Sequence, residues 1–315
     1  EQTVFEIAEQ ETRGRKSYQN ISAYTDVVME RMQERAESGN SITGIRTGYH
    51  DLDSITAGFQ RADLIIIAGR PAMGKSALAV NIAETAAIKD KLSVAIFSME
   101  MQAEQLTMRM MSSLANIDQQ KVRTGKLDGD DWIRFTSTVG ILQKTKMFID
   151  DTPALTPAEL RARCRRISRE HGLDLVVVDY LQMMQVSGTT ENRATEISEI
   201  SRSLKAMAKE LNIPVIALSQ LNRSVESRQD KRPVMSDLRE SGAIEQDADV
   251  IIFIYRDEVY DEESSDKGMA EIIISKQRNG PIGKLKLAWR GQYTRFDNFV
   301  KDPLTYDSPS VGKYE

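Results

Sequence analysis

The chain has 315 residues, of which 40% are hydrophobic, 28% charged and 6% aromatic, and its formal net charge is −5. This charge argues against a protein that coats nucleic acid through bulk positive charge, although a local basic channel remains compatible with it. The single cysteine, Cys164, and the two histidines, His50 and His171, exclude a disulfide framework and disfavour zinc hydrolases and histidine-based triads. No apolar run approaches the ~20 residues of a transmembrane helix. We therefore expect a protein of a reducing, cytoplasmic compartment with no membrane partner.

Two helical segments are expected at the amino-terminal end, joined by a polar connector. Residues 1–11 are too few to form a stable helix alone, so this segment is either a fraying terminus or an arm that docks on another domain or subunit. Residues 21–37 form the second helix, and the apolar residues that share one of its faces are Ile21, Tyr24, Val28 and Met32. Because the chain starts at Glu1 without a signal-peptide pattern, we expect a fragment or a processed product.

From residue 64 the pattern changes to strands that alternate with helices. Unbroken apolar runs of strand length are typical of a parallel sheet that is buried on both faces. The runs are residues 64–68, 94–97, 147–149, 175–178, 215–218 and 250–254. Two alternating segments, 271–276 and 283–289, are joined through Asn279-Gly280, which predicts a C-terminal β-hairpin.

These patterns predict an α/β protein with a mostly parallel central sheet, a C-terminal β-hairpin and an N-terminal helical arm. The expected boundaries are a linker helix and connector over residues 1–20, the α/β core over 21–302 and a polar tail over 303–315.

A phosphate-binding loop follows the first strand of the predicted sheet. Residues 69–76 match the pattern G-x-x-x-x-G-K-[ST] in full, between a strand and a helix. Glycines let the backbone amides face a phosphate, the helix N-terminus adds its dipole, and Lys75 neutralises phosphate charge. The chain is therefore predicted to bind a nucleoside triphosphate. The residues expected to contact it are Gly69, Arg70, Pro71, Ala72, Met73, Gly74, Lys75, Ser76 and Ala77.

Three further residues follow predicted strands of the same sheet. Asp179 stands where the magnesium-holding acid of such sites belongs, and the Ser76 hydroxyl is the expected second Mg²⁺ ligand. Glu100 lies among apolar neighbours, which favours a raised pKa and a role as catalytic base, but it is equally compatible with a glutamate at a helix N-terminus. Gln220 could contact the γ-phosphate or simply face solvent.

Taken together, these residues resemble the DnaB-type replicative DNA helicase family, which is built on a RecA-like core. The segments that carry the resemblance are residues 69–76, 98–101, 178–182, 217–223, 237–249 and 276–280. The resemblance runs from Val4 to about Phe299, and the run 237–249 is far longer than a generic nucleotide motif.

The resemblance implies a homohexameric ring that hydrolyses ATP with Mg²⁺ between subunits, moves 5′ to 3′ on single-stranded DNA and unwinds duplex at the replication fork. It implies that Glu100 is the catalytic base, Asp179 the magnesium-associated acid and Gln220 the γ-phosphate sensor. Lys276 and Arg278 match a basic pair that acts on the γ-phosphate of the neighbouring subunit. Without the resemblance, this pair would be compatible with a solvated cationic strand end.

Contacts to DNA are expected from two loops. Arg239, Glu240 and Gly242 match a family loop that follows the DNA backbone, and residues 185–193 form a second polar loop. Few aromatic residues lie here, which favours phosphate contacts over base stacking. From the residues alone, the run 237–249 could also be only a capped surface helix.

The resemblance also bears on partners. Full-length members of the family carry an N-terminal helical domain that helps to shape the ring and recruits primase. We expect this chain to be without that domain, while residues 1–11 match the linker helix that packs on the adjacent subunit. We expect primase and a helicase loader as partners of the full-length protein, at bacterial replication forks.

Two other functions remain open. One is a RecA-like recombinase or a clock-type ATPase on the same core, which nucleotide-dependent filaments without unwinding would indicate. The other is a nucleotide switch or loader scaffold with negligible turnover. Glu100, Lys276 and Arg278 argue against the switch, because a protein that only binds nucleotide needs none of them.

Overall fold

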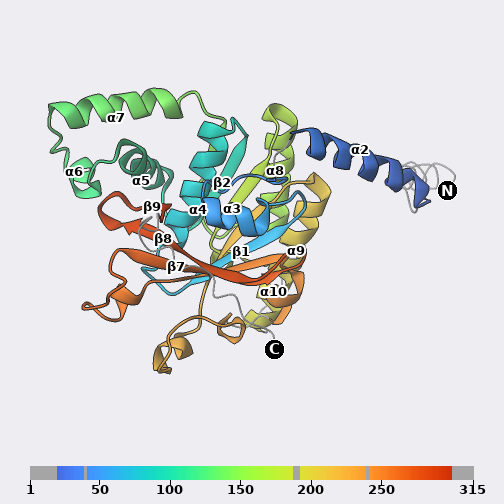
Figure 1. Cartoon of the computed structure of the whole chain (residues 1–315). Helices are drawn as coiled ribbons and strands as arrows, with labels where there is room; N and C mark the ends of the chain where they lie inside the picture. The colour runs from blue at the N-terminus through green and yellow to red at the C-terminus, as the bar shows by residue number, and fades with distance from the viewer. Residues whose placement is uncertain (1–19, 39–40, 187–191, 239–241, 300–315) are drawn as a thin grey trace, which may run out of the picture. The chain divides into compact units, whose positions relative to one another are not determined.

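The computed structural model describes residues 20–38, 41–186, 192–238 and 242–299, and the chain divides into two units, Glu1–Thr43 and Gly44–Glu315 (Figure 1). The α-helices are α2 (Ser22–Ser38), α3 (His50–Thr56), α4 (Lys75–Glu84), α5 (Ala103–Ala115), α6 (Gln119–Thr124), α7 (Gly129–Leu142), α8 (Pro157–His171), α9 (Arg193–Leu211) and α10 (Gly242–Asp247). The strands are β1 (Leu64–Gly69), β2 (Val94–Ser98), β3 (Met147–Asp150), β4 (Leu175–Asp179), β5 (Val215–Gln220), β6 (Val250–Tyr255), β7 (Met269–Gln277), β8 (Gly283–Arg290) and β9 (Arg295–Asn298).

The first unit contributes one described helix, α2. Its bounds agree with the predicted helix to within one residue at each end. The four residues predicted to share an apolar face at this helix are all exposed, from 54% for Tyr24 to 77% for Ile21. The predicted helix over residues 1–11 lies outside the described residues.

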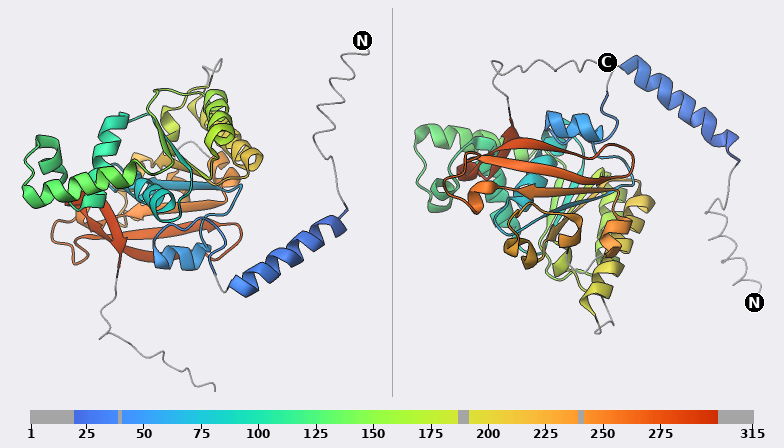
Figure 2. Two further views of the ribbon diagram at one scale, coloured as in Figure 1. Left: turned by 90° about the horizontal axis from the view of Figure 1, so that it is seen from above. Right: turned by 60° about the horizontal axis from the view of Figure 1, so that its bottom comes forward.

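The second unit contains a sheet with the strand order β3-β2-β4-β5-β1-β6-β7-β8-β9. The first six of these strands run parallel, and β7, β8 and β9 add an antiparallel ribbon at one side, whose red and orange strands are visible in Figure 2. The α/β class, the mostly parallel sheet and the C-terminal hairpin are therefore confirmed.

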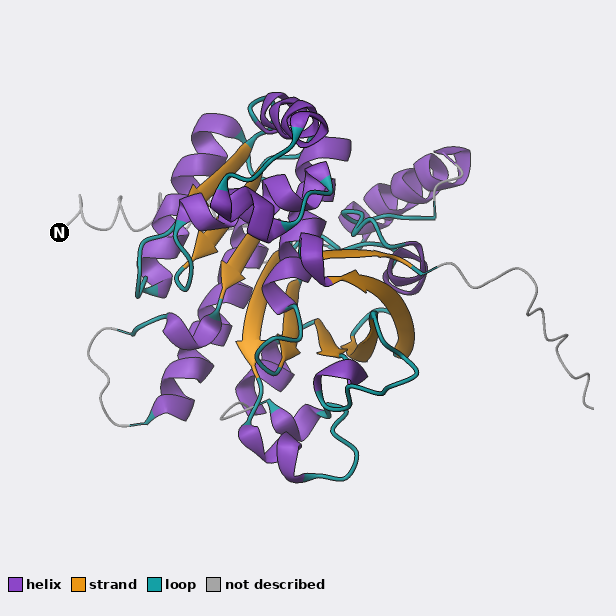
Figure 3. Ribbon diagram, turned by 90° about the vertical axis from the view of Figure 1, so that its left-hand side faces the viewer, coloured by secondary structure: helices purple, strands orange, loops and turns teal. Residues whose placement is uncertain are grey.

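Helices cover both faces of the parallel strands, as Figure 3 shows, and this is why their sequences lack polar alternation. Along β1, Ile65 and Ile67 pack in one core with α4, while Leu64 and Ile66 pack in a second core with α9. Each such side chain contributes about 1.5–3 kcal/mol when it is fully buried.

Two local features differ from the prediction. The helix expected after the phosphate loop ends as an α-helix at Glu84, and Thr85–Lys89 continue it as a π-helical turn. Strand β9 was not predicted, because it has four residues and only Phe296 among them is fully buried. It pairs with β8 after a short turn, Gly291–Tyr293.

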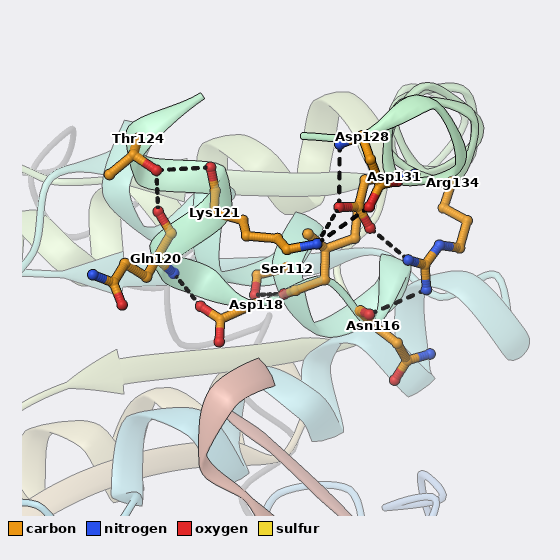
Figure 4. A network of polar contacts seen from close by, with 10 residues as sticks. Ser112, Asn116, Asp118, Gln120, Lys121, Thr124, Asp128, Asp131 and Arg134 are labelled. Carbon is orange, nitrogen blue, oxygen red and sulfur yellow. Dashed lines mark hydrogen bonds and ion pairs between the residues drawn. The ribbon is translucent and has the colours of Figure 1, made fainter. Parts of the chain in front are cut away.

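A polar network fixes the helices that follow β2, as Figure 4 shows. The Asp131 carboxylate, which is almost fully buried, accepts hydrogen bonds from Lys121 at 2.8 Å and from Arg134 at 2.6 Å. Asp128 and Asp131 form a capping box at the start of α7. These contacts hold α7 beside α5 and α6, while Trp132 and Ile133 on α7 stay exposed.

Glu84, at the end of α4, is a buried carboxyl group. Its Oε2 accepts hydrogen bonds from Asn81 at 3.2 Å and Ser113 at 3.3 Å, whereas Oε1 is buried without a hydrogen-bond partner among the described residues. Burial raises the pKa of Glu84 to about 8, although the charge of Arg295 opposes this shift. The group is therefore mostly protonated at neutral pH, and its ionisation destabilises the fold.

We expect Glu84→Gln to gain stability relative to the wild type as the pH rises. The folded pKa of about 8 lies above the ordinary glutamate value, so the wild type loses stability between about pH 4.5 and pH 8, whereas the variant has no group to ionise there. The difference in unfolding free energy should change by about 1 kcal/mol per pH unit within this range. Urea unfolding at pH 5, 6, 7 and 8 measures it, with Glu199→Gln on the exposed side of α9 as control. A pH-independent difference would contradict the assignment.

Candidate active site

A pocket of about 340 Å³ opens at the carboxyl edge of the parallel strands. Parallel strands end at the same edge of a sheet, so residues that follow β1, β2, β4 and β5 meet here although they lie far apart in the sequence. The residues that line it are Pro71, Ala72, Gly74, Lys75, Ser76, Ala77, Glu100, Arg109, Gln119, Tyr180, Gln220, Trp289 and Thr294.

The loop between β1 and α4 is built around Gly74. This residue has a φ of 96°, and a Cβ atom there would lie 2.8 Å from the Phe296 ring. Both the backbone conformation and the close packing therefore require glycine. Because α4 starts at Lys75, its free amide groups point toward the loop, where an anion would be stabilised.

Lys75 lines the pocket, and Asp179, which does not line it, is close enough for the charges of the two groups to interact. Burial lowers the pKa of Lys75, while the charges of Asp179 and Glu100 oppose this change. Burial raises the pKa of Asp179. The Ser76 hydroxyl, which hydrogen-bonds to the Asp179 carboxylate, acts in the opposite direction and lowers that pKa. A buried carboxylate and a hydroxyl in direct contact are the hard oxygen ligands that Mg²⁺ takes, so this pair fits the metal that the sequence predicts.

Glu100 and Gln220 also line the pocket. Glu100 follows β2 in a turn that the Ser98 hydroxyl fixes by donating to the Met101 carbonyl at 2.8 Å. The Glu100 side chain is exposed, so its apolar neighbours in sequence do not bury it. Gln220 ends β5, and its backbone N–H donates to Gln182 at 3.3 Å.

Several lining residues were not predicted, because no pattern in their own segments marks them as pocket residues. They are Arg109 on α5, Gln119 on α6, Tyr180 after β4, and Trp289 and Thr294 near the carboxyl end.

The Trp289 ring is fixed within the antiparallel ribbon. Phe296 lies beside it with ring centroids 4.5 Å apart, and the Arg256 guanidinium lies 4.7 Å from its centroid. Arg256 also donates to the Ala72 carbonyl of the phosphate loop at 2.8 Å. The tryptophan thus presents a rigid apolar surface to the pocket, suited to an aromatic base. The one sequence signal for it was its place in an alternating strand.

Three predicted loop contacts, Gly69, Arg70 and Met73, do not line the pocket. The Arg70 guanidinium instead pairs with Glu226 at 2.7 Å and donates to the Leu221 carbonyl at 2.9 Å. Arg70 therefore connects the loop to the segment after β5.

Lys276 and Arg278 lie at the opposite edge of the sheet. In the sheet, Lys276 on β7 lies opposite Ile251, the second residue of β6. Asp249, the residue before β6, accepts a hydrogen bond from the backbone N–H of Leu64, which is the first residue of β1. The phosphate loop leaves the other end of β1, six residues away, or about 20 Å in an extended strand. The pair therefore cannot reach the pocket of its own chain.

The predicted DNA contacts are only partly within the described chain. Arg239 and Glu240 lie outside the described residues. Gly242 is the exposed first residue of α10, and a Cβ atom there would meet no described atom within 4 Å.

Residues 44–298 match the family described as "DnaB-like helicase C terminal domain". The chain belongs to this family. It is 56% identical over 306 residues to the replicative DNA helicase DnaB of Pasteurella multocida (strain Pm70), a match that covers 96% of this chain and 66% of that protein. The chain thus spans slightly less than two thirds of this curated relative.

Two solved structures are similar to this DnaB-like domain. One, an ATPase domain, has a TM-score of 0.86 at 37% identity, and the match covers 90% of this chain and all of that one. The other, a DnaB-like replicative helicase solved in a study of its interactions with primase, has a TM-score of 0.82 at 37% identity, over 94% of this chain and 71% of that one. The family resemblance and the RecA-like fold predicted from the sequence are confirmed.

Membership in the DnaB-like family implies nucleotide hydrolysis. Among the described residues, no cluster of three His, Cys, Asp or Glu side chains could hold a metal by itself. A metal at Ser76 and Asp179 would therefore need further ligands from the nucleotide or from water. In the part of the chain that the structure describes, no helix is both long and apolar enough to cross a membrane.

Proposed function

We propose that this chain is the ATP-hydrolysing motor of a replicative DNA helicase, which works as a hexameric ring, moves 5′ to 3′ on single-stranded DNA and unwinds the duplex at the replication fork. The observation that carries the proposal is the separation of two half-sites. One edge of the sheet holds a phosphate loop with a candidate base, and the opposite edge holds a basic pair.

Within one subunit, each group of pocket residues has a different role in hydrolysis. The loop amides and Lys75 bind the β- and γ-phosphates of ATP, and Ser76 and Asp179 hold Mg²⁺. Bound Mg²⁺ neutralises phosphate charge. The exposed carboxylate of Glu100 accepts the proton of the attacking water, and Gln220 contacts the γ-phosphate, so that β5 responds to its loss.

A second subunit completes the site. Lys276 and Arg278 would approach the γ-phosphate of a neighbour and stabilise the charge that develops during transfer. A head-to-tail contact of this kind, repeated around an axis, closes into a ring. Hydrolysis then takes place between subunits.

Exposed apolar side chains support assembly with other copies of the chain. On α7, Trp132 is 51% exposed and Ile133 66%, and the apolar residues of α2 are similarly open to solvent. Large apolar side chains that remain exposed in one copy are candidates for burial between copies. The predicted linker segment 1–20 would add to this contact.

The DNA strand would lie along the loops that precede α9 and α10, with contacts from Arg239, Glu240 and Gly242 to its phosphates. The predicted polar loop over residues 185–193 leads into α9, and α9 packs against α10. The helices that these two loops precede are therefore neighbours. The structurally similar DnaB-like helicase interacts with primase, and we propose primase and a helicase loader as partners of the full-length protein.

The test is ATP turnover per subunit, measured against protein concentration with and without single-stranded DNA. A motor that a neighbour completes should show turnover that rises with concentration and with DNA. Flat, DNA-independent turnover would contradict both the intersubunit site and the DNA loops.

A further inference from the structure

Strand β5 extends past its pairing with β4. The last paired residues of these two strands are Val178 and Ala217, whereas β5 runs on to Gln220, which is paired with Gly69 of β1. The N–H and C=O groups of a strand residue need partners on the side where pairing has ended. The position of Gln220, the proposed γ-phosphate sensor, therefore depends on what binds the end of β5 there.

The side-chain amide of Gln182 binds this end of β5. Its Oε1 accepts from the Gln220 backbone N–H at 3.3 Å, and its Nε2 donates to the Gln220 carbonyl at 3.3 Å and to the Ser219 hydroxyl at 3.0 Å. One amide group thus bonds both the main-chain donor and the main-chain acceptor of the same residue. Because Gln182 follows soon after Asp179 at the end of β4, these bonds fix Gln220 relative to the magnesium-associated acid.

Gln182 is itself held in place. It lies in the short 3₁₀ turn Leu181–Met183, and the preceding side chain, Leu181, is fully buried. The Gln182 carbonyl accepts from the guanidinium of Arg193, the first residue of α9. The amide is therefore presented to β5 from a backbone that the core and α9 both fix.

Arg70 binds the residue that follows the sensor. Its Nη1 donates to the Leu221 carbonyl at 2.9 Å, and its Nε and Nη2 bond to Glu226 at 2.8 and 2.7 Å. The Leu221 N–H in turn donates to the Gly69 carbonyl at 3.4 Å. The Arg70 side chain is 8% exposed, and its planar guanidinium suits fixed bonds to several partners. The chain around Gln220 is thus bonded both to the phosphate loop and to the segment after β4.

We propose that Gln182 and Arg70 are positioning residues that set the Gln220 side chain against the γ-phosphate of bound ATP. Neither of them lines the pocket, so each acts through Gln220. The inference rests on the proposed function, because it assumes that Gln220 contacts the γ-phosphate. It adds how this sensor is aligned with the loop that binds the phosphates and with the acid that holds Mg²⁺.

The test is a double-mutant cycle between Gln182→Met and Gln220→Ala, measured as kcat for ATP. Methionine has a similar size to glutamine but no amide, so Gln182→Met removes the bonds to β5. Alone, it should lower kcat by about 10- to 100-fold, the order of loss when a reacting group is misplaced by about 1 Å. In the Gln220→Ala background, where no sensor is left to position, it should have no further effect. The affinity for ADP, which has no γ-phosphate, should stay at the wild-type value.

Gln60→Met is the matched control. The Gln60 amide also donates to two main-chain carbonyls, those of Ala57 and Gly58, at 3.0 Å each, but it lies before β1, at the end of that strand remote from the phosphate loop. This variant should leave kcat unchanged in both backgrounds. If Gln182→Met does not fold, Arg70→Met gives an independent measurement, because it releases Leu221 and should show the same dependence on Gln220.

The outcomes are distinguishable. Wild-type turnover by folded Gln182→Met would overturn the positioning role, as would an equal loss of kcat in the presence and absence of the Gln220 side chain. A parallel loss of ADP affinity would also overturn it, because it would indicate general damage to the pocket. Wild-type turnover by Gln220→Ala would instead show that Gln220 is not a sensor, and would overturn that part of the proposed function together with this inference.

Discussion

Replacing Glu100 by glutamine is expected to stop ATP turnover while nucleotide binding is retained. The glutamine has the same size, and the binding contacts assigned to the loop, Lys75 and Asp179 do not involve the Glu100 side chain. What is lost is the carboxylate that accepts a proton from water, a contribution of about 10²- to 10⁴-fold in rate. Fluorescent-nucleotide titration measures binding, and phosphate release measures turnover.

Glu104→Gln is the matched control, since Glu104 is an exposed glutamate four residues further on, in the first turn of α5. It should leave both quantities unchanged. Hydrolysis at the wild-type rate by Glu100→Gln would show that Glu100 is not the base, and that its place after β2 reflects only a favourable position near the start of a helix.

The sequence predicts those features of the structure that are determined by residues close together in the chain. The apolar run at residues 64–68 corresponds to β1 because burial on both faces leaves no polar position, and the glycine-lysine-serine pattern determines the loop that follows. Asp179, Glu100 and Gln220 line or flank one pocket because each lies at or just beyond the end of a parallel strand. These inferences need only the pattern of apolar residues along each strand and the topology of a parallel sheet.

The remaining site residues depend on packing between distant segments. Trp289 enters the pocket because the antiparallel ribbon extends the sheet beyond β6, and its register is set by pairings with β7 and β9 that no local pattern specifies. Arg70 belongs to the phosphate loop by sequence, yet a distant glutamate, Glu226, draws its side chain away from the pocket. The ion pair of Arg278 with Asp249, at 3.2 Å, joins two further distant segments and could not be predicted for the same reason.

Arg278→Ala is expected to reduce turnover by about 10³- to 10⁵-fold, the range observed when an arginine finger is absent. The variant should still bind nucleotide, because Arg278 lies at the sheet edge opposite its own phosphate loop. The decisive measurement is a titration of Arg278→Ala with Lys75→Ala, two variants that are each inactive alone. Lys75→Ala cannot bind phosphate but still presents Lys276 and Arg278.

In mixed rings, some interfaces pair the intact phosphate loop of an Arg278→Ala subunit with the intact arginine of a Lys75→Ala subunit. Turnover should therefore rise on mixing and pass through a maximum at intermediate ratios, whereas each variant alone stays inactive. Arg166→Ala, which removes an exposed arginine from α8, should behave as the wild type. Mixtures that remain inactive at every ratio would exclude action in trans. Because the separation of the two half-sites along β1 also leaves no route for action within one chain, Arg278 would then have no role at the γ-phosphate.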